Sequence, residues 1–203
     1  MQLTLSLVGM PGGGKSTVGR LLARQLDMPF VDSDAEIEKD LGGESIKDYF
    51  ARQGEASFRD LESRVIARLL EGAGTDREMI LATGGGAVLR EINRERLKAH
   101  STVVYLRSSP EELFRRLKHD TQRPLLQVSN PLAKLRDLYG QRDPLYRRCA
   151  HFVLESSRPS VHGLANMILM QLELAGLIDP ARVAATVGAS EAPYTSGNDR
   201  SAS

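Results

Sequence analysis

The segment at residues 9–17 has the residue types and the spacing of a phosphate-binding loop. It reads Gly9-Met10-Pro11-Gly12-Gly13-Gly14-Lys15-Ser16-Thr17. Glycines adopt backbone conformations that other residues avoid, so successive N–H groups can point at one anion. The ammonium group of Lys15 adds positive charge for the terminal phosphates, and the hydroxyl of Ser16 can bind Mg²⁺. This loop therefore indicates a site for a nucleoside triphosphate.

The residues on either side of the loop support this interpretation. Residues Leu3–Val8 form a short apolar run typical of a strand, and Val18, Leu21, Leu22 and Leu26 then recur at helical spacing. A helix that begins at the loop points its positive end at a bound anion. A glycine-rich turn that matched the pattern by chance would not be expected between such a strand and such a helix.

Two aspartates, Asp32 and Asp34, lie at the end of the next apolar run. Because side chains alternate along an extended chain, both carboxylates would point the same way. Beside a magnesium–nucleotide site, one could hold the water shell of the metal, and the other could accept a hydrogen bond from an attacking hydroxyl. Aspartate is also favoured at helix starts whatever the function, and the residues alone leave both interpretations open.

Three consecutive glycines, Gly84, Gly85 and Gly86, follow a further apolar run at 79–82. Lacking side chains, they can leave backbone N–H groups open to an anionic or hydroxyl-bearing ligand. A plain tight turn would have the same composition, so the glycines alone do not decide between a ligand contact and a turn.

Arginines form the last group that could contact a ligand, at Arg59, Arg123 and Arg142. A guanidinium group is planar and can bind a carboxylate or a phosphate through two hydrogen bonds. Taken alone, each arginine is more typical of a solvated surface residue or an ion-pair partner. Arg59 has Glu55 and Glu62 at helical spacing as such partners.

The composition of the chain excludes several other classes of protein. Its 203 residues are 41% hydrophobic and 26% charged, as in an ordinary globular domain. A net charge of +1 and only 5% aromatic residues give no reason to expect a nucleic acid or a membrane as partner. The single cysteine, Cys149, can form no internal disulfide, so we expect a reducing cytoplasm. No signal peptide is recognisable, and the apolar stretch at 164–177 is too short to span a membrane.

Apolar runs that alternate with helical patterns predict the fold. Strands are expected at 3–8, 29–32, 79–82, 103–106 and 151–154, with helices between them. This alternation predicts a three-layer α/β/α domain with a five-stranded parallel sheet. Ligands bind beyond the carboxyl ends of such strands, which would bring the loop, the aspartates and the glycines to one crevice.

Two boundaries are expected from local composition. The helix that opens at Asn130-Pro131 is expected to run through Tyr139, and residues 178–203 are expected to form a disordered C-terminal tail after a domain at 1–177.

Taken together, these segments resemble the shikimate kinases, small members of the nucleoside monophosphate kinase-like group of P-loop proteins. Each motif is weak alone, but their combination, order and spacing are specific to that family. The matching segments are G-M-P-G-G-G-K-S-T-V-G-R at 9–20, V-D-S-D at 31–34, S-I-K-D-Y-F at 45–50, G-E-A-S-F-R at 54–59, A-T-G-G-G-A-V at 82–88, R-P-L-L at 123–126 and R-D-P-L-Y at 142–146.

The resemblance implies ATP-dependent phosphorylation of the 3-hydroxyl of shikimate, in the route to the aromatic amino acids. At the matching positions, Asp34 would bind the substrate hydroxyls and act as base or orienting group, and Arg59 and Arg142 would clamp the carboxylate. Lys15 and Arg123 would stabilise charge on the moving phosphoryl group.

The resemblance also implies the remaining contacts. Further shikimate contacts would come from Gly84, Gly85, Gly86, Phe50 and Phe58, although helix packing is an equal alternative for the two phenylalanines. ATP contacts would come from Gly12, Gly13, Gly14, Lys15, Ser16, Thr17, Arg116, Arg123 and Arg158. Ser16 and Asp32 would hold Mg²⁺, Asp32 through water. Substrate-binding helices are expected at about 33–63 and a lid at about 117–130, in a protein that we expect to be a monomer.

Two alternatives remain. A different small-molecule kinase of the same build, such as a gluconate kinase, would also bind a compact carboxylate. A GTPase-like switch or a non-catalytic regulator is disfavoured because the chain has no Asn-Lys-x-Asp segment and retains Asp34.

Overall fold

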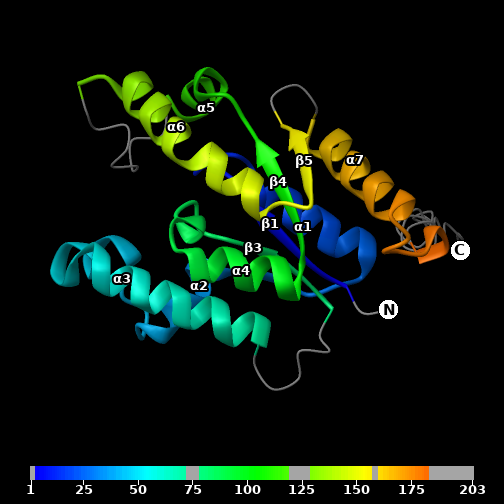
Figure 1. Cartoon of the computed structure of the whole chain (residues 1–203), viewed down its shortest axis with the longest axis horizontal. Helices are drawn as coiled ribbons and strands as arrows, with labels where there is room; N and C mark the ends of the chain where they lie inside the picture. Colours follow the sequence, from blue (N-terminus) through cyan, green and yellow to red (C-terminus); the bar gives the residue numbers. More distant parts are fainter. Residues whose placement is uncertain (1–2, 72–77, 119–128, 157–159, 183–203) are drawn as a thin grey trace, which may run out of the picture.

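The apolar run before the phosphate loop forms β1 (Thr4–Val8), the central strand of a five-stranded sheet. The computed structural model describes residues 3–71, 78–118, 129–156 and 160–182 (Figure 1). The other strands are β2 (Phe30–Asp32), β3 (Met79–Ala82), β4 (Thr102–Arg107) and β5 (Phe152–Glu155). Their order is β2-β3-β1-β4-β5, and every neighbouring pair is parallel. The predicted fold class is confirmed.

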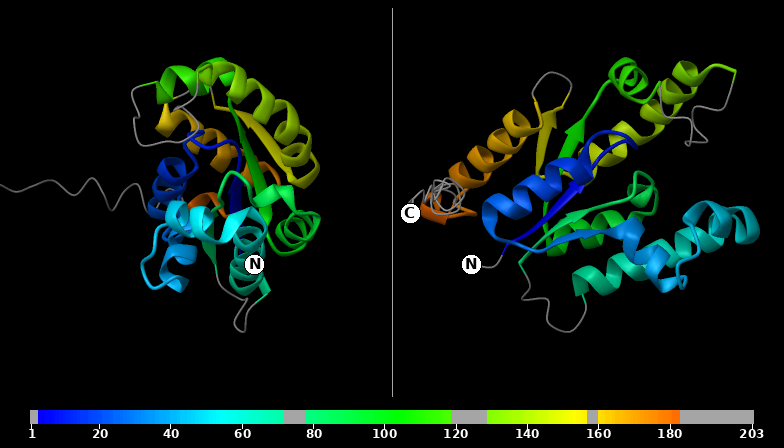
Figure 2. Two further views of the ribbon diagram at one scale, coloured as in Figure 1. Left: turned by 90° about the vertical axis from the view of Figure 1, so that its left-hand side faces the viewer. Right: turned by 180° about the vertical axis from the view of Figure 1, so that it is seen from behind.

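Helices cover both faces of this sheet. They are α1 (Lys15–Leu26), α2 (Ser33–Asp40), α3 (Ile46–Glu71), α4 (Glu91–His100), α5 (Pro110–Leu117), α6 (Pro131–Cys149) and α7 (Val161–Leu174), with a 3₁₀ turn η1 (Ala87–Leu89). Helices α1 and α7 lie together on one face, as the rear view in Figure 2 shows, and α3, α4 and α6 lie on the other.

Alternation along β1 explains why the sheet has an apolar core on each side. Leu5 and Leu7 are fully buried against α1 and α7, whereas Val8 is fully buried in the core on the opposite face. Successive side chains of a strand point to opposite faces, so one apolar strand serves both layers. The phosphate loop is thereby anchored by a strand that is buried on both faces.

Helix α3 is kinked at Gly54, where the backbone takes φ 80° and ψ 173°. Gly54 interrupts the helical conformation, although helical residues continue on both sides. Beyond the kink, Phe58, Leu61 and Val65 pack with Ile37 of α2 in a small separate core. Helices α2 and α3 thus form a unit with packing of its own beside the sheet.

The prediction that the helix opening at Asn130-Pro131 runs only through Tyr139 was wrong. Helix α6 continues to Cys149 and contains Pro144. Proline removes one helical hydrogen bond and is normally disfavoured there. The buried residues Tyr146 and Cys149 extend the packed face of α6 past this proline, so tertiary contacts outweigh the local signal. The longer helix places Arg142, Asp143 and Tyr146 on neighbouring turns.

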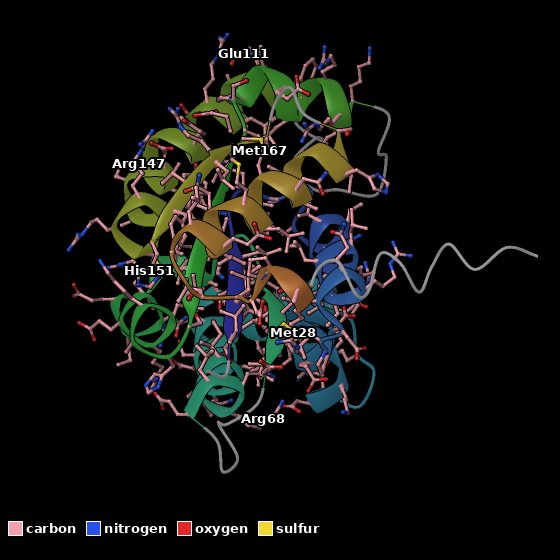
Figure 3. The ribbon with its side chains drawn as sticks, turned by 90° about the vertical axis from the view of Figure 1, so that its right-hand side faces the viewer. Met28, Arg68, Glu111, Arg147, His151 and Met167 are labelled. Carbon is pink, nitrogen blue, oxygen red and sulfur yellow. The ribbon has the colours of Figure 1, made fainter. Side chains whose placement is uncertain are left out.

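The folded part of the chain also extends beyond residue 177, which was the expected limit. Ile178 is only 9% exposed and belongs to the same core as Met28. Figure 3 shows Met28 beside the last described turn of the chain. Arg182 donates to the carbonyl oxygen of Leu26 at 2.9 Å and to both carboxylate oxygens of Glu78 at 2.8 and 2.7 Å. Residues 178–182 are therefore part of the packed domain. Residues 183–203 lie outside the described residues.

No helix in the described ranges combines the length and the apolar character needed to cross a membrane.

Candidate active site

The phosphate loop has the backbone geometry that its glycines predicted. Gly12 and Gly14 have φ angles of 78° and 88°, in the left-handed region that side chains disfavour. The N–H of Gly13 donates to the carbonyl oxygen of Met10 at 3.0 Å and closes the turn. The loop ends at Gly14, which caps the N-terminus of α1, so the positive end of that helix faces the loop.

Lys15 lies against this loop. Its buried ammonium group donates to the carbonyl oxygens of Gly9 and Met10, at 2.9 and 3.0 Å. A hollow of about 300 Å³ opens at the loop, and Arg116 of α5 forms part of its wall. Its lining residues are Gly12, Gly14, Lys15, Ser16, Thr17, Arg116 and Leu117. Backbone N–H groups, an ammonium and a guanidinium suit a polyphosphate.

Ser16 and Asp32 form the pair expected at a magnesium site. The hydroxyl of Ser16 donates to Oδ2 of Asp32 at 2.8 Å, and Oδ1 accepts from the N–H of Asp34 at 3.1 Å. Asp32 therefore caps α2 and faces the phosphate loop at the same time. The cap interpretation is confirmed, and the role toward a metal stays a prediction. A hydroxyl and a carboxylate are hard oxygen ligands of the kind Mg²⁺ takes together with nucleotide phosphates. Within the described ranges, no three His, Cys, Asp or Glu side chains cluster as metal ligands.

The three consecutive glycines bring the predicted acceptor residues together. A Cβ atom on Gly84 would lie 2.5 Å from Oδ1 of Asp34, and one on Gly86 would collide with the guanidinium of Arg59. Between them, the carbonyl oxygen of Gly85 accepts a hydrogen bond from Nη1 of Arg142 at 3.1 Å. Side chains from α2, α3 and α6 therefore converge on one turn beside the phosphate loop. Only glycine leaves room for such close approaches.

The N–H groups of this turn differ from the expectation at one position. The N–H of Gly84 donates to the hydroxyl of Ser33 at 2.9 Å, so this amide is not open to a ligand. The N–H groups of Gly85 and Gly86 have no hydrogen-bond acceptor among the described residues. These two amides remain available to a ligand in the way that the glycine run predicted.

Arg59 is held by a buried carboxylate. Its Nη1 donates to Oε2 of Glu62 at 2.7 Å, and Glu62 is only 1% exposed. The more distant contact with Glu55, at 3.4 Å, involves a largely exposed partner. A buried ion pair fixes the guanidinium of Arg59 more firmly than a surface pair could. Its partner Glu62 is therefore a residue of the site, although the sequence indicated only an ion pair on a helix surface.

Burial shapes the electrostatics of the two carboxylates. The pKa of Asp34 is raised above its ordinary value of 3.8, chiefly by burial and then by the charge of Asp32, while Lys15 and Arg59 oppose the shift. The pKa of Glu62 is raised, chiefly by burial, with Arg59 opposing. A carboxylate with a raised pKa is a better proton acceptor when ionised than one in water.

Arg142 retains an unsatisfied donor. Its Nε is buried and has no hydrogen-bond partner in the described part of the chain, although Nη1 is bound to Gly85. A buried donor without an acceptor is costly and calls for an acceptor from elsewhere. A carboxylate oxygen of a bound ligand would satisfy it, which fits the role predicted for this arginine.

The other residues predicted to contact shikimate or ATP either have structural contacts or lie outside the described residues. Phe58 is buried in the core shared by α2 and α3, with its ring centroid 5.7 Å from that of the more exposed Phe50. Arg116 is held by Glu112 at 3.1 Å and by the carbonyl oxygen of Ser156 at 2.5 Å. Arg123 and Arg158 lie outside the described residues, as does most of the expected lid at 117–130.

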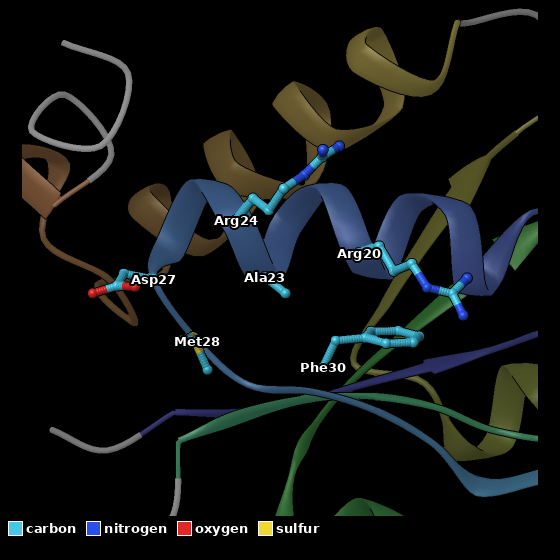
Figure 4. Close-up of a pocket in the computed structure, with 6 residues that line it drawn as sticks. All are labelled: Arg20, Ala23, Arg24, Asp27, Met28 and Phe30. Carbon is cyan, nitrogen blue, oxygen red and sulfur yellow. The ribbon is translucent and has the colours of Figure 1, made fainter. Parts of the chain in front are cut away.

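A more spacious hollow, of about 550 Å³, lies between α1 and the segment leading into β2 (Figure 4). Its lining residues are Arg20, Ala23, Arg24, Asp27, Met28 and Phe30. In Figure 4, Arg20 lies over the ring of Phe30, 4.8 Å from its centroid, and Arg24 points away from that ring. The predicted phosphate-binding and acceptor residues do not line this hollow, so volume alone does not locate the active site.

Three residues of the site were not assigned from the sequence: Ser33, Glu62 and Tyr146. Each lies close in sequence to a residue that was assigned. Ser33 separates the two aspartates, Glu62 follows Arg59 by three positions on a helix, and Tyr146 follows Arg142 by four. For Glu62 and Tyr146 that spacing was the available signal, because residues three or four apart lie on one helix face.

The fold and this site define a class of protein. A parallel sheet that carries a phosphate loop, with a carboxylate and two arginines converging beside it, is the architecture of a P-loop kinase that acts on a small molecule. Three comparisons with known proteins narrow this class.

The model of the family described as "Shikimate kinase" matches residues 11–173. The shikimate kinase of Paracidovorax citrulli is 55% identical over 181 residues, which cover 89% of this chain and 97% of the relative. That of Burkholderia pseudomallei is 56% identical over 172 residues, covering 84% and 90%. A solved structure described as shikimate kinase from Acinetobacter baumannii in complex with shikimate aligns with a TM-score of 0.79 at 44% identity, covering 88% and 97%. The chain belongs to the shikimate kinase family.

Proposed function

We infer that this enzyme transfers the terminal phosphoryl group of ATP to the 3-hydroxyl of shikimate, giving shikimate 3-phosphate and ADP on the route to the aromatic amino acids. Membership of the family supports this activity. The observation that carries it is the convergence of Asp34, Arg142 and Arg59 on the three consecutive glycines beside the phosphate loop.

The arrangement of charges suits the acceptor. Shikimate is a small ring with a carboxylate and hydroxyl groups. Arg59 and Arg142 would bind the carboxylate, the latter through its unsatisfied Nε as well. Asp34 would accept a hydrogen bond from the attacking hydroxyl, and burial makes it a stronger base than an exposed aspartate. The enzyme mainly positions and neutralises, because phosphoryl transfer needs little covalent help.

Nucleotide and metal would be held on the other side of the acceptor. Gly12, Gly13 and Gly14 would direct backbone N–H groups at the phosphates, and Lys15 would exchange its loop carbonyls for phosphate oxygens. Ser16 and Asp32 would hold Mg²⁺, directly and through water. When bound, the metal neutralises charge that develops between the phosphates.

The assignments that lie outside the described residues remain proposals from the family resemblance. Arg123 would stabilise the transferred phosphoryl group, Arg158 would join Arg116 near the nucleotide, and the segment around 117–130 would exclude water from the site. We also propose a monomeric cytoplasmic enzyme. Its single cysteine, Cys149, is a free and buried thiol, which suits a reducing compartment.

A coupled ADP-release assay with several acceptors tests the activity. We expect the purified protein to consume ATP only when shikimate and Mg²⁺ are both present. Gluconate, AMP and CMP serve as alternative acceptors. Faster turnover with gluconate would favour the other small-molecule kinase, and equal ATP consumption without any acceptor would contradict the proposed closed acceptor site.

A further inference from the structure

Tyr146 lies one helical turn beyond Arg142 on α6 and binds the same atom. Its hydroxyl donates a 2.5 Å hydrogen bond to the carbonyl oxygen of Gly85, which also accepts from Nη1 of Arg142 at 3.1 Å. The Tyr146 side chain is fully buried. Burial also raises the pKa of Tyr146 to about 12, so the hydroxyl remains a hydrogen-bond donor near neutral pH.

A second tyrosine fixes the ring of Tyr146. Tyr105 of β4 is fully buried and stacks on it, with ring centroids 4.8 Å apart and an interplanar angle of 29°. The hydroxyl of Tyr105 donates to Oδ1 of Asp143 at 2.9 Å. Asp143 also accepts from Arg107 of β4 at 3.2 Å and from Arg147 at 2.7 Å. Figure 3 shows Arg147 on the outer side of α6. This network joins α6 to the centre of the sheet at the level of Arg142.

The opposite side of Gly85 is closed by the phosphate loop. A Cβ atom on Gly85 would lie 2.6 Å from the ring of Pro11. Gly85 is therefore confined between the loop and α6, and the described side chains that hydrogen-bond to its carbonyl are those of Arg142 and Tyr146. These two donors determine the direction of this carbonyl.

The direction of the Gly85 carbonyl also determines the direction of the next N–H group. The carbonyl of Gly85 and the N–H of Gly86 belong to one planar trans peptide, in which they point in opposite directions. Because the carbonyl is held toward α6, the N–H of Gly86 points away from α6. This N–H has no acceptor among the described residues, and the guanidinium of Arg59 lies against the same glycine.

We propose that Tyr146 is a positioning residue of the acceptor site. Its hydroxyl orients the peptide between Gly85 and Gly86 so that the N–H of Gly86 faces the acceptor, and it keeps the shared carbonyl in place for Arg142. The identity of the acceptor in this inference rests on the proposed function. Tyr146 touches neither of the reacting groups and acts through the glycine turn.

The variant Tyr146→Phe tests this role because it removes only the hydroxyl and keeps the stacked ring. Tyr139→Phe is the matched control: Tyr139 lies on the same helix and its hydroxyl accepts from Nε of Arg107 at 2.7 Å, at the edge of the network, but it makes no bond to Gly85. Steady-state kinetics and calorimetric titration with shikimate are measured for both. We expect Tyr146→Phe to raise the KM and the Kd for shikimate about 5–10-fold, as for loss of one buried hydrogen bond. The kcat and the KM for ATP should change less than about twofold, and Tyr139→Phe should match the wild type.

Three results would overturn the role of Tyr146. An unchanged KM and Kd for shikimate in Tyr146→Phe would show that the hydroxyl does not position the turn. An equal rise in Tyr139→Phe would point to a general loosening of α6. A fall in kcat together with a rise in the KM for both substrates would show that the hydroxyl supports the whole domain and has no specific role at the acceptor site.

Two further measurements keep the outcome clear. If Tyr146→Phe does not fold, Tyr105→Phe is measured in its place. This variant loses the hydrogen bond from Tyr105 to Asp143, and the KM for shikimate should rise about 2–3-fold. An unchanged KM would count against the positioning role of Tyr146. If the wild type does not phosphorylate shikimate, the proposed function fails. If the wild type is active and Tyr146→Phe is indistinguishable from it, only the positioning role fails.

Discussion

The hydroxyl of Ser16 donates a 2.8 Å hydrogen bond to Oδ2 of Asp32, which joins the first turn of α1 to the carboxyl end of β2. The other carboxylate oxygen of Asp32 caps α2, the helix that carries Asp34. The proposed metal ligands and the proposed base are therefore placed by one aspartate. A change in Asp32 can be designed to separate its structural role from its role toward the metal.

Asp32→Asn should weaken the response to Mg²⁺ and leave the fold intact. Asparagine caps a helix about as well as aspartate, but it carries no charge for the metal or its water shell. We expect the Mg²⁺ concentration for half-maximal activity to rise about 10–100-fold, the range for loss of an outer ligand partner. Thermal unfolding without metal should be nearly unchanged. An unaltered Mg²⁺ titration would remove Asp32 from the metal site.

Asp34→Asn should lose phosphoryl transfer and keep nucleotide binding. The substitution removes the proposed base at the glycine turn, and the nucleotide contacts proposed for the phosphate loop lie elsewhere. We expect kcat to fall about 10²–10⁴-fold, as for loss of a general base. Titration with ATP should give a Kd close to that of the wild type. Wild-type turnover in this variant would show that Asp34 is not the base.

The same substitution should stabilise the protein at neutral and higher pH. The pKa of Asp34 is raised in the folded state, chiefly by burial, so the folded protein binds this proton more tightly than the unfolded chain does. The resulting stability is fully present below the ordinary pKa of 3.8 and is lost as the pH rises through the raised value. At pH 8 the ionised Asp34 therefore destabilises the fold, and Asp34→Asn should raise the Tm by about 2–4 °C.

This stabilisation should depend on pH in a defined direction. The difference in Tm between Asp34→Asn and the wild type should shrink as the pH falls toward 4. Glu95→Gln, which alters an exposed carboxylate on α4, is the control and should show no such trend. A lower Tm for Asp34→Asn at pH 8 would contradict the buried-charge argument.

Gly86→Ala should impair acceptor binding without strain in the backbone. Gly86 has φ −98° and ψ −5°, which alanine adopts readily, but its Cβ would collide with the guanidinium of Arg59. Because the displaced guanidinium would lose its contact geometry, we expect kcat/KM for shikimate to fall about tenfold or more. The KM for ATP should not change.

Gly140→Ala provides the comparison, because a Cβ on this α6 glycine would meet nothing within 4 Å. Alanine there should leave the kinetics unchanged and should stabilise the protein by about 0.4–1 kcal/mol. If Gly86→Ala behaved in the same way, Arg59 would not be positioned against the glycine turn as the structure has it.

Truncation after Leu177 should destabilise the domain, whereas truncation after Arg182 should not. The shorter chain loses the buried side chain of Ile178 and the contacts of Arg182 with Leu26 and Glu78. Burial of an isoleucine stabilises by about 1.5–3 kcal/mol, and the half-exposed ion pair adds up to about 1 kcal/mol. The free energies of unfolding of the two chains, measured in urea, should therefore differ by about 1.5–4 kcal/mol. Equal urea midpoints for the two chains would show that the folded domain ends at residue 177.

Local patterns were sufficient for most of the fold and for the core of the site. The phosphate loop between an apolar strand and a helix, and the alternation of strands with helices, predicted a parallel sheet with the loop at its carboxyl edge. The position of Asp34 and of the three glycines followed from the same rule, since each group ends a strand. The family resemblance assigned Arg59 and Arg142 roles that the residue types alone left open.

The tertiary structure decided which polar groups are buried and what they contact. Sequence spacing suggested an ion pair of Arg59 with Glu62, but only packing shows that Glu62 is buried and that the pair lies against Gly86. The hydroxyl of Ser33 accepts a hydrogen bond from the N–H of Gly84, 51 residues away, and the hydroxyl of Tyr146 donates one to the carbonyl of Gly85, 61 residues away. Helix α6 continues past Pro144 because Tyr146 and Cys149, on its C-terminal side, are buried. Backbone patterns are local and can be read along the chain, whereas burial and the pairing of buried polar groups depend on neighbours that only folding brings together.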